Sequence, residues 1–141
     1  MEIVADSGGI YGLYDNRDPA HSGLRRAIEV ERGRVVIPEI TLGEIDYLFR
    51  SRLGNRALLR FLDDVNSGAF RIESVTPQDL IRCGELITRY QDADLGLSDA
   101  AVAVTADRLG TNRILTVDVR DFRLVRSARG KPFRLLPADL A

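Results

Sequence analysis

Short apolar runs recur along this chain, and each of them stops at a polar or turn-forming residue. Runs of this length between turn signals are typical of buried strands, and a run that alternates apolar with polar residues is typical of a half-buried strand. The first run ends at Asp6 and a later one ends at Asp118. These patterns predict five strands, over residues 3–5, 34–38, 70–75, 114–117 and 133–136.

The segments between these runs carry apolar residues at helical spacing or signals of helix ends. Gly54 and Gly110 are placed to end helices, Pro77 to open one, and Asn55 and Ser98 to cap others. We therefore expect helices over residues 19–31, 41–53, 56–65, 77–90 and 98–110. Strands that alternate with helices favour an α/β fold, a three-layer α/β/α sandwich around a mostly parallel central sheet. Ligands of such sheets bind at the carboxyl ends of the strands.

Length and composition narrow the class of protein. A chain of 141 residues is long enough for one domain with a core and short for two, so we expect a single domain over residues 1–141. No apolar run approaches the ~18 residues that span a bilayer, and the N-terminus lacks the pattern of a signal peptide. We therefore expect no membrane association and a cytoplasmic location. The one cysteine, Cys83, shares an apolar helical stripe with Leu80, Ile87 and Tyr90 and is expected in the core.

Charge is distributed unevenly along a chain whose net charge is −1. Seven cations and two carboxylates give residues 113–134 a net charge of +5. Of the 20 basic residues in the chain, only Lys131 is a lysine. Arginine suits phosphate recognition, although a GC-rich coding sequence would give the same bias. Nucleic-acid binding is therefore one of two interpretations of this segment.

Four acidic residues occupy positions at which a fold usually places apolar side chains, namely Asp6, Glu44, Asp99 and Asp118. Asp6 and Asp118 follow predicted strands, whereas Glu44 and Asp99 share the apolar faces of predicted helices. In a first helical turn, Asp99 could also complement the helix dipole alone, which stabilises by ~0.3–1 kcal/mol. Each acid by itself favours a structural interpretation. Four together favour a shared cation, because converging carboxylates stay ionised most readily around a divalent metal.

The types of ligand available narrow the metal and its chemistry. Oxygen ligands without partnering cysteine or histidine favour Mg²⁺ or Mn²⁺ over zinc. The only histidine, His21, lies in a polar segment and is expected in solvent, which argues against a serine-protease-like triad. A turn is expected at residues 6–9, without the spacing of a Walker loop or a dinucleotide fingerprint. The leading use of a carboxylate metal cluster is phosphoester hydrolysis.

Short motifs along nearly the whole chain resemble those of PIN-domain ribonucleases, and more narrowly of VapC-type toxins from type II (VapBC) toxin–antitoxin systems. They cover residues 4–7, 42–48, 90–92, 97–101 and 114–118, followed by Asp121 and Phe122. Each motif alone is a weak pattern. Their order and the 19-residue separation of Asp99 and Asp118 make the combination fairly specific.

The resemblance implies a PIN-like fold and a Mg²⁺-dependent endoribonuclease, with Mn²⁺ as a substitute metal. It assigns catalysis and metal binding to four acids, namely Asp6, Glu44, Asp99 and Asp118. Ser7 and Thr116 match small hydroxyl positions that support the cluster, and Asp92 and Asp94 are further acids near it. Residues 8–9, both glycine, depart from the family's pattern and suggest a looser local turn.

The resemblance also implies binding partners. These are an RNA substrate, a second copy in a homodimer, and a small VapB-type antitoxin whose tail occupies the active-site groove, often through a basic side chain. RNA cleavage would inhibit translation, and both tRNA and a structured ribosomal RNA loop are substrates in the family. Two alternatives stay open. One is a non-catalytic PIN-like module that binds RNA or a partner, and the other is a Mg²⁺-dependent phosphatase or DNA nuclease that uses the same carboxylates.

Overall fold

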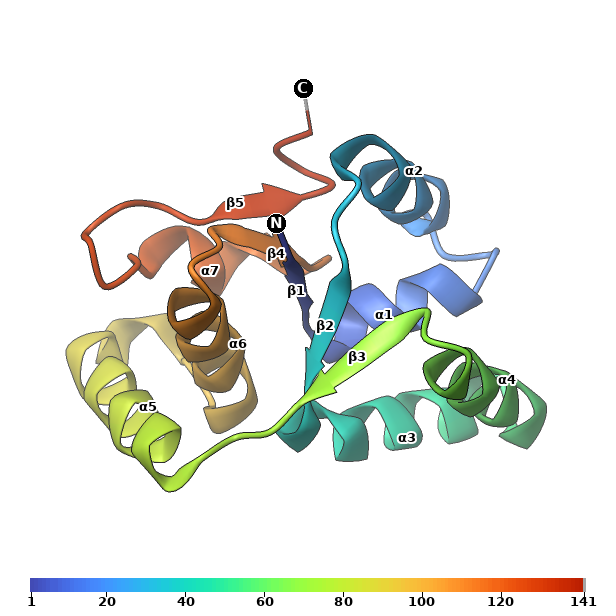
Figure 1. The fold of residues 1–141 in the computed structure, drawn as a ribbon, viewed down its shortest axis with the longest axis horizontal. Helices are drawn as coiled ribbons and strands as arrows, with labels where there is room; N and C mark the ends of the chain where they lie inside the picture. Colours follow the sequence, from blue (N-terminus) through green and yellow to red (C-terminus); the bar gives the residue numbers. More distant parts are fainter. Residues whose placement is uncertain (141) are drawn as a thin grey trace.

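A central parallel sheet organises the chain, of which a computed structural model describes residues 1–140. Five strands follow one another in the order β3-β2-β1-β4-β5, and every neighbouring pair is parallel (Figure 1). The strands are β1 (Ile3–Ala5), β2 (Val35–Pro38), β3 (Phe70–Glu73), β4 (Arg113–Leu115) and β5 (Arg134–Leu136). The predicted α/β class is therefore confirmed.

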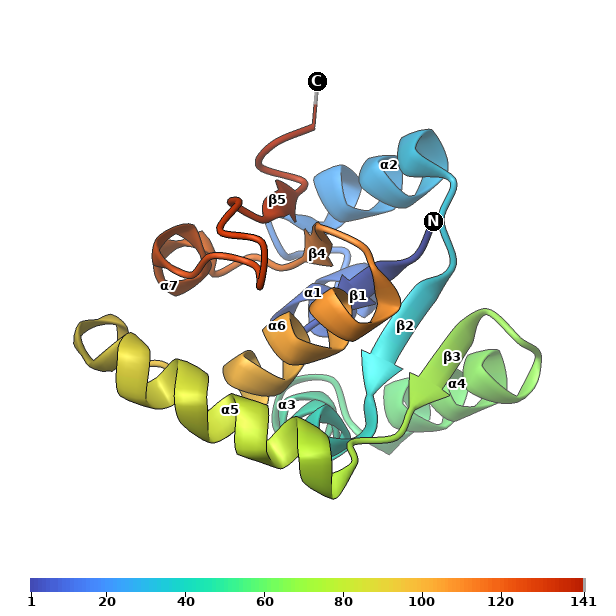
Figure 2. The same cartoon turned by 60° about the vertical axis from the view of Figure 1, so that its left-hand side comes forward.

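Helices cover both faces of the sheet, which gives the three predicted layers (Figures 1 and 2). On one face lie α1 (Ser7–Tyr14), α2 (His21–Glu31), α3 (Leu42–Arg52) and α4 (Asn55–Asn66). On the other face lie α5 (Pro77–Arg89), α6 (Leu97–Leu109) and α7 (Val119–Leu124). Two 3₁₀ turns precede α3 and α6, namely η1 (Glu39–Thr41) and η2 (Gln91–Ala93). Within residues 1–140 no helix is both long and apolar enough to cross a membrane.

Side chains of the strands alternate between two apolar cores. Ile3 and Ala5 of β1 join the core beneath α1–α4, whereas Val4 joins the core beneath α5–α7. Both faces of the sheet are covered, and strands β1 and β2 are apolar throughout, as is usual for parallel sheets, whereas the edge strand β3 carries Arg71 and Glu73. In the α1–α4 core, the rings of Phe49 and Phe61 are buried and their centroids lie 5.6 Å apart. Such aromatic pairs add ~0.5–1.5 kcal/mol to the gain from burial alone.

Helix α6 is embedded in the structure, with α5 packed along it and strands β1, β2 and β4 beside it. Residues 100–106 are all buried, and Asp99 lies in the first turn of the same helix. The backbone that carries this acid is therefore fixed by the core. Cys83 of α5 is fully buried, as predicted, but Leu80 is 44% exposed, so the buried stripe of α5 is narrower than the sequence predicts.

Two helices were not predicted. A turn was expected at residues 6–9, but α1 begins at Ser7, and the backbone N–H of Gly9 donates to Asp6 Oδ1 at 2.8 Å. Asp6 thus acts as the N-cap of α1, and three glycines in the helix hid it, because glycine is a weak helix former. Helix α7 has only six residues, too few to show a periodic pattern.

The predicted helix caps are also partly wrong. Gly54 and Gly96, rather than Asn55 and Ser98, occupy the N-cap positions of α4 and α6. Neither predicted cap is required, because each of these residues lies inside the first turn of its helix. The predicted end of α6 at Gly110 is confirmed, with a φ of 74° in the left-handed region that glycine tolerates.

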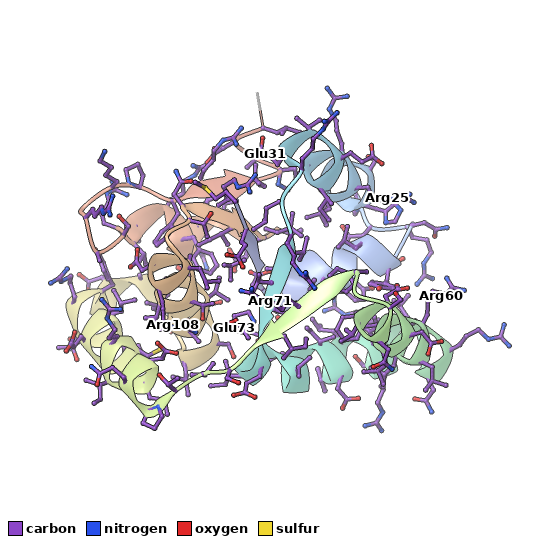
Figure 3. The ribbon with its side chains drawn as sticks, in the orientation of Figure 1. Arg25, Glu31, Arg60, Arg71, Glu73 and Arg108 are labelled. Atoms are coloured by element: carbon purple, nitrogen blue, oxygen red, sulfur yellow. The ribbon has the colours of Figure 1, made fainter. Side chains whose placement is uncertain are left out.

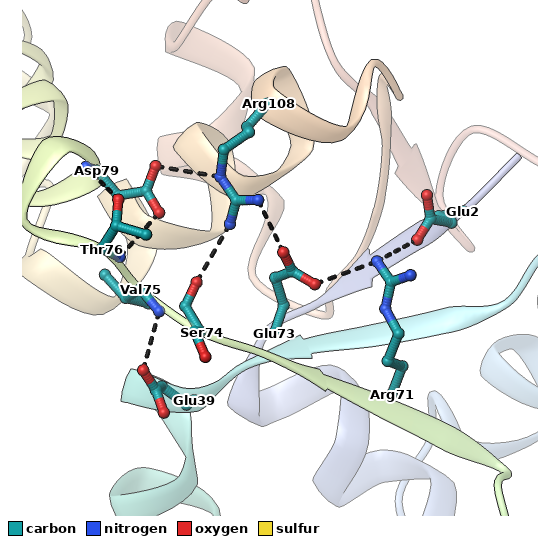
Figure 4. A network of polar contacts seen from close by, with 9 residues as sticks. All are labelled: Glu2, Glu39, Arg71, Glu73, Ser74, Val75, Thr76, Asp79 and Arg108. Atoms are coloured by element: carbon teal, nitrogen blue, oxygen red, sulfur yellow. Dashed lines mark hydrogen bonds and ion pairs between the residues drawn. The ribbon is translucent and has the colours of Figure 1, made fainter.

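Arg108 ties the end of α6 to the edge of the sheet and to α5. Its guanidinium donates to Glu73 Oε2 at 2.7 Å and to Asp79 Oδ1 at 3.2 Å (Figure 4). It also donates to the carbonyl oxygen of Ser74 at 3.2 Å. In Figure 3, Arg108 and Glu73 lie side by side, although 35 residues separate them in the sequence. One side chain therefore joins three elements, and the carboxylate of Asp79 depends on it.

Replacing Arg108 should destabilise the fold. Arg108→Ala leaves the buried carboxylate of Asp79 without its cation, which costs on the order of 1–3 kcal/mol in the free energy of unfolding. Urea unfolding at neutral pH measures this loss. Arg56→Ala is the matched control, because Arg56 of α4 is exposed and has no ion pair within residues 1–140; its effect should stay within about 0.5 kcal/mol. Equal stabilities for the two variants would contradict the role given to Arg108.

Candidate active site

The four candidate acids come together at the carboxyl edge of the sheet. Asp6 directly follows β1, and Asp118 follows β4, the neighbouring strand in the sheet. Glu44 and Asp99 lie in the first turns of α3 and α6. The chain leaves β1 and β4 toward opposite sides of the sheet at this point, and parallel α/β sheets bind ligands at such a switch point.

Asp6 is the innermost member of the cluster. Its carboxylate is buried, accepts a hydrogen bond from the N–H of Gly9, and accepts another from the hydroxyl of Thr116. Burial raises the pKa of Asp6 from 3.8 to about 7, although both hydrogen bonds act in the opposite direction. The charges of Asp99 and Asp118 raise this pKa further, so both acids lie close enough to interact with Asp6.

Asp99 is the second acid whose ionisation is hindered. It is half-buried at the start of α6, and burial is the main cause that raises its pKa from 3.8 to about 6. The next causes are the charges of Glu44 and Asp118, followed by those of Asp121 and Asp94. Asp99 therefore interacts with carboxylates from three other elements of the fold.

Glu44 and Asp118 form an exposed rim, contrary to the expectation that all four acids replace apolar side chains. Periodicity placed Glu44 on an inward helix face, and Asp118 was expected at the end of a buried strand. The first turn of α3 and the N-cap of α7 lie at the edge of the sheet, where solvent reaches both acids. The hydroxyl of Ser7 donates to Glu44 Oε1 at 3.2 Å. The N–H of Asp118 donates to Thr116 Oγ1 at 3.2 Å. Ser7 and Thr116 thus contact the cluster, as the resemblance implied.

Asp92 and Asp94 were expected as further acids near the cluster, and the structure distinguishes between them. Asp94 and Asp121 raise the pKa of Asp99, whereas Asp92 is exposed in η2 and is not among the main causes of this shift. Asp121 was noted only as part of a motif. The signal for it was its position three residues after Asp118, in the first turn of α7. Asp46 is half-buried and pairs with Arg50 at 3.5 Å on the outer side of α3.

His21 is wrongly predicted to be free in solvent. It begins α2, is half-buried, and its Nδ1 lies 2.8 Å from the carbonyl oxygen of Gly12. This contact joins the start of α2 to α1 on the face that carries α1–α4. The expectation that His21 takes no part in the acidic cluster is consistent with this position.

Comparison with known proteins assigns the family. The model of the PIN domain matches residues 3–127. The chain belongs to the PIN-domain family. It is 30% identical over 135 residues to Ribonuclease VapC26 of Mycobacterium tuberculosis, a match that covers 96% of this chain and all of that protein.

Solved structures share the fold of this PIN domain. VapC20 of Mycobacterium tuberculosis, described as a sarcin–ricin loop cleaving toxin, aligns with a TM-score of 0.76 and 22% identity over 84% of this chain and 92% of its own. VapBC from Salmonella typhimurium bound to DNA gives a TM-score of 0.67 and 19% identity, with 96% of both chains covered. VapBC2 from Rickettsia felis, bound to a DNA fragment from its promoter, gives a TM-score of 0.66 and 16% identity, with 89% of this chain and 93% of its own covered.

The donor set of this PIN domain fits a hard divalent cation. All four candidate ligands are carboxylates, and within residues 1–140 none of them forms a salt bridge with a basic side chain. No three His, Cys, Asp or Glu side chains in this part of the chain are grouped closely enough to hold an ion as they stand. Mutual repulsion favours such spacing, and the exposed Glu44 and Asp118 have room to move.

Asp6→Asn should stabilise the metal-free protein at alkaline pH. Because the pKa of Asp6 is higher in the folded than in the unfolded state, its protonation contributes to the free energy of unfolding. This contribution is complete below about pH 4 and is lost as the pH rises through about 7. At pH 8 the variant should therefore be more stable than the wild type by roughly 2–4 kcal/mol, with little difference at pH 4. Urea unfolding in EDTA at both pH values measures the effect. Asp63→Asn on α4 changes an exposed carboxylate and should have no such pH dependence; identical behaviour of the two variants would refute the assignment.

Proposed function

We propose that this PIN domain is a Mg²⁺- or Mn²⁺-dependent endoribonuclease, the toxin of a toxin–antitoxin pair. The observation that carries the proposal is the group of four carboxylates at the β1–β4 switch point, none of which forms a salt bridge with a basic side chain of residues 1–140. A relative that is 30% identical over 96% of this chain is a ribonuclease, which supports RNA as the substrate. Converging carboxylates stay ionised most readily around a divalent cation.

Each residue of the site has a role that follows from its contacts. Asp6 and Asp99, with Glu44 and Asp118, would hold the cation. When bound, it would activate water for in-line attack on the scissile phosphate and stabilise the leaving 3′-oxygen, giving 5′-phosphate and 3′-hydroxyl ends. Thr116 fixes the Asp6 carboxylate through its hydroxyl. The exposed rim gives a phosphodiester access from solvent.

The proposed partners follow from the relatives. Two proteins of similar fold are VapBC complexes bound to DNA, which supports a VapB-type antitoxin for this chain. Its tail would reach the acidic cluster, where an arginine or lysine side chain can replace the metal as the counter-charge. We also propose a homodimer. For the substrate, both tRNA and a structured ribosomal RNA loop are retained, and the cleavage would inhibit translation.

The proposed RNA-binding surface differs from the basic segment of the sequence. Arg113 and Arg134 both pair with Glu31, and Arg123 forms two hydrogen bonds with Asp139 at 2.6 and 2.8 Å. These three arginines form ion pairs within the fold. Within residues 113–134, we therefore assign phosphate binding only to cations other than these three.

Of the four remaining cations, all but Arg120 line two adjoining cavities, the first of them between α5 and the segment that follows α7. Arg82 and Arg89 of α5 line it together with Arg126, and an adjoining cavity is lined by Arg129 and Lys131. The N–H of Arg126 donates to the hydroxyl of Tyr90, at the start of the segment that leads to α6 and Asp99. We assign the RNA backbone to this series of cations.

Asp99→Asn tests the proposed chemistry. The variant should fold normally but bind Mn²⁺ at least tenfold more weakly in calorimetry, because one metal ligand is neutralised. It should also lose Mg²⁺-dependent RNA cleavage. Asp92→Asn is the control, since Asp92 is exposed and is not one of the four proposed metal ligands. Parallel assays on single-stranded DNA and on a small phosphate ester separate a ribonuclease from the alternative enzymes. Full cleavage by Asp99→Asn would exclude the proposal, and metal binding without cleavage of any of the three would favour a non-catalytic module.

The cationic surface is tested through salt dependence. Combined replacement of Arg126, Arg129 and Lys131 by alanine should weaken RNA binding by the Asp99→Asn protein. The slope of log affinity against log salt should fall by about 2, or ~0.7 for each phosphate that the protein no longer neutralises. A variant with Arg25, Arg26 and Arg56 replaced has the same charge change at exposed positions on other helices. If both triple variants change the slope equally, the effect is one of net charge and the surface is assigned wrongly.

A further inference from the structure

Tyr47 is the one tyrosine that the fold does not use. The hydroxyls of Tyr11 and Tyr14 donate to Asp15 and Asp64, and the hydroxyl of Tyr90 accepts from a backbone N–H. Tyr47 is 71% exposed, and within residues 1–140 its ring has no aromatic partner and its hydroxyl no hydrogen bond. A large ring in solvent contributes little to folding, so Tyr47 is available to contact a ligand.

The ring stands beside the acidic cluster. Tyr47 follows Glu44 by three residues on α3, so the two side chains are neighbours on the surface of the helix. One shallow hollow is lined by Ser7, Gly43, Glu44, Tyr47 and Leu48. Gly43 has no side chain, and a Cβ built there would meet no atom within 4 Å, so the hollow is open above the helix. The aromatic face and the Glu44 carboxylate therefore border the same open space.

Other apolar side chains near the cluster are exposed as well. Val117, directly before Asp118, is 44% exposed, and Leu97, two residues before Asp99, is 46% exposed. The acids thus lie among apolar surface. A nucleotide matches this combination, since its phosphate is attracted to a cation at the carboxylates while its base presents a flat apolar face. An acidic protein segment would be repelled by the same carboxylates.

We propose that Tyr47 is a stacking platform for an unpaired base of the RNA, adjacent to the phosphate that is cut. This inference rests on the proposed ribonuclease function and adds to it a substrate-binding residue with a preference for single-stranded or looped RNA. Stacking on an aromatic ring tolerates every base, because each base has a π face. Tyr47 therefore contributes to the choice of RNA conformation and not of sequence.

The chain offers a spectroscopic test, because it contains no tryptophan. Tyr47→Trp in the Asp99→Asn background introduces the single indole of the protein at the proposed platform. A short single-stranded RNA oligonucleotide should quench its fluorescence, and the same RNA in a duplex should not. Val30→Trp is the matched control, since Val30 is 51% exposed on α2, toward the opposite edge of the sheet, and should respond to neither. Equal responses of both tryptophans, or none at position 47 at saturating RNA, would overturn the proposal.

Kinetics with modified substrates supply the second measurement. Tyr47→Ala should raise KM for single-stranded RNA by about 5- to 100-fold with little change in kcat, whereas Tyr47→Phe should remain close to the wild type. An RNA that lacks one base beside the cleavage position should have a KM for the wild type that is raised by a similar factor. The KM of Tyr47→Ala should be the same for this RNA as for the intact one. If base removal raises KM by the same factor in the wild type and in Tyr47→Ala at every RNA position tested, the ring contacts no base.

The outcomes separate this inference from the proposed function. If Asp99→Asn cleaves RNA as well as the wild type, the proposed metal chemistry fails irrespective of Tyr47. If Asp99→Asn is inactive while Tyr47→Ala cleaves normally, only the stacking role fails. If both variants lose activity, light scattering separates the two explanations for Tyr47→Ala. A change from dimer to monomer in this variant would place the ring in an interface between two copies of this chain and overturn its role in binding RNA.

Discussion

Crowding of carboxylates at one edge of a parallel sheet is the constraint on which the rest of this site depends. Asp6 is placed there by β1, and the fold supplies two hydrogen bonds to its carboxylate, from Gly9 and Thr116. These contacts lower its pKa, yet burial outweighs them and the pKa rises to about 7. The protein alone therefore stabilises the shape of the cluster but not its full charge, which is the condition that a divalent cation corrects.

Close packing between α1 and β4 makes this crowding possible. A Cβ at Gly9 would lie 2.4 Å from the carbonyl oxygen of Leu115, and a Cβ at Gly8 would lie 3.1 Å from Val117. Residues 8–9 thus form a tight contact, and the expectation of a looser turn there is wrong. At position 9 only glycine lets α1 begin against β4, and this approach brings Asp6 within reach of the Thr116 hydroxyl.

The sequence predicted the sheet well because apolar runs report burial on both faces, as for residues 3–5, and strand ends then located Asp6 and Asp118 at one edge. It could not predict how far the first turn of a helix extends beyond that edge. Glu44 and Asp99 have similar patterns, yet one is exposed and the other half-buried, because exposure depends on neighbouring elements such as α7. Helix α7, which also brings Asp121 to the cluster, is too short for a periodic signal.

The distribution of arginines separates the positive surface of the proposed RNA-binding site from its acidic cluster. At the amino edge of the sheet, Arg113 and Arg134 are neutralised by Glu31. The cations beside α5, such as Arg89 and Arg126, have no carboxylate within salt-bridge distance in residues 1–140 and stand apart from the four acids. Placed among the carboxylates, they would compete with the metal as counter-charges. Under the proposed function, separation of the two charge types would let one surface hold the phosphate backbone while the metal keeps its carboxylate ligands.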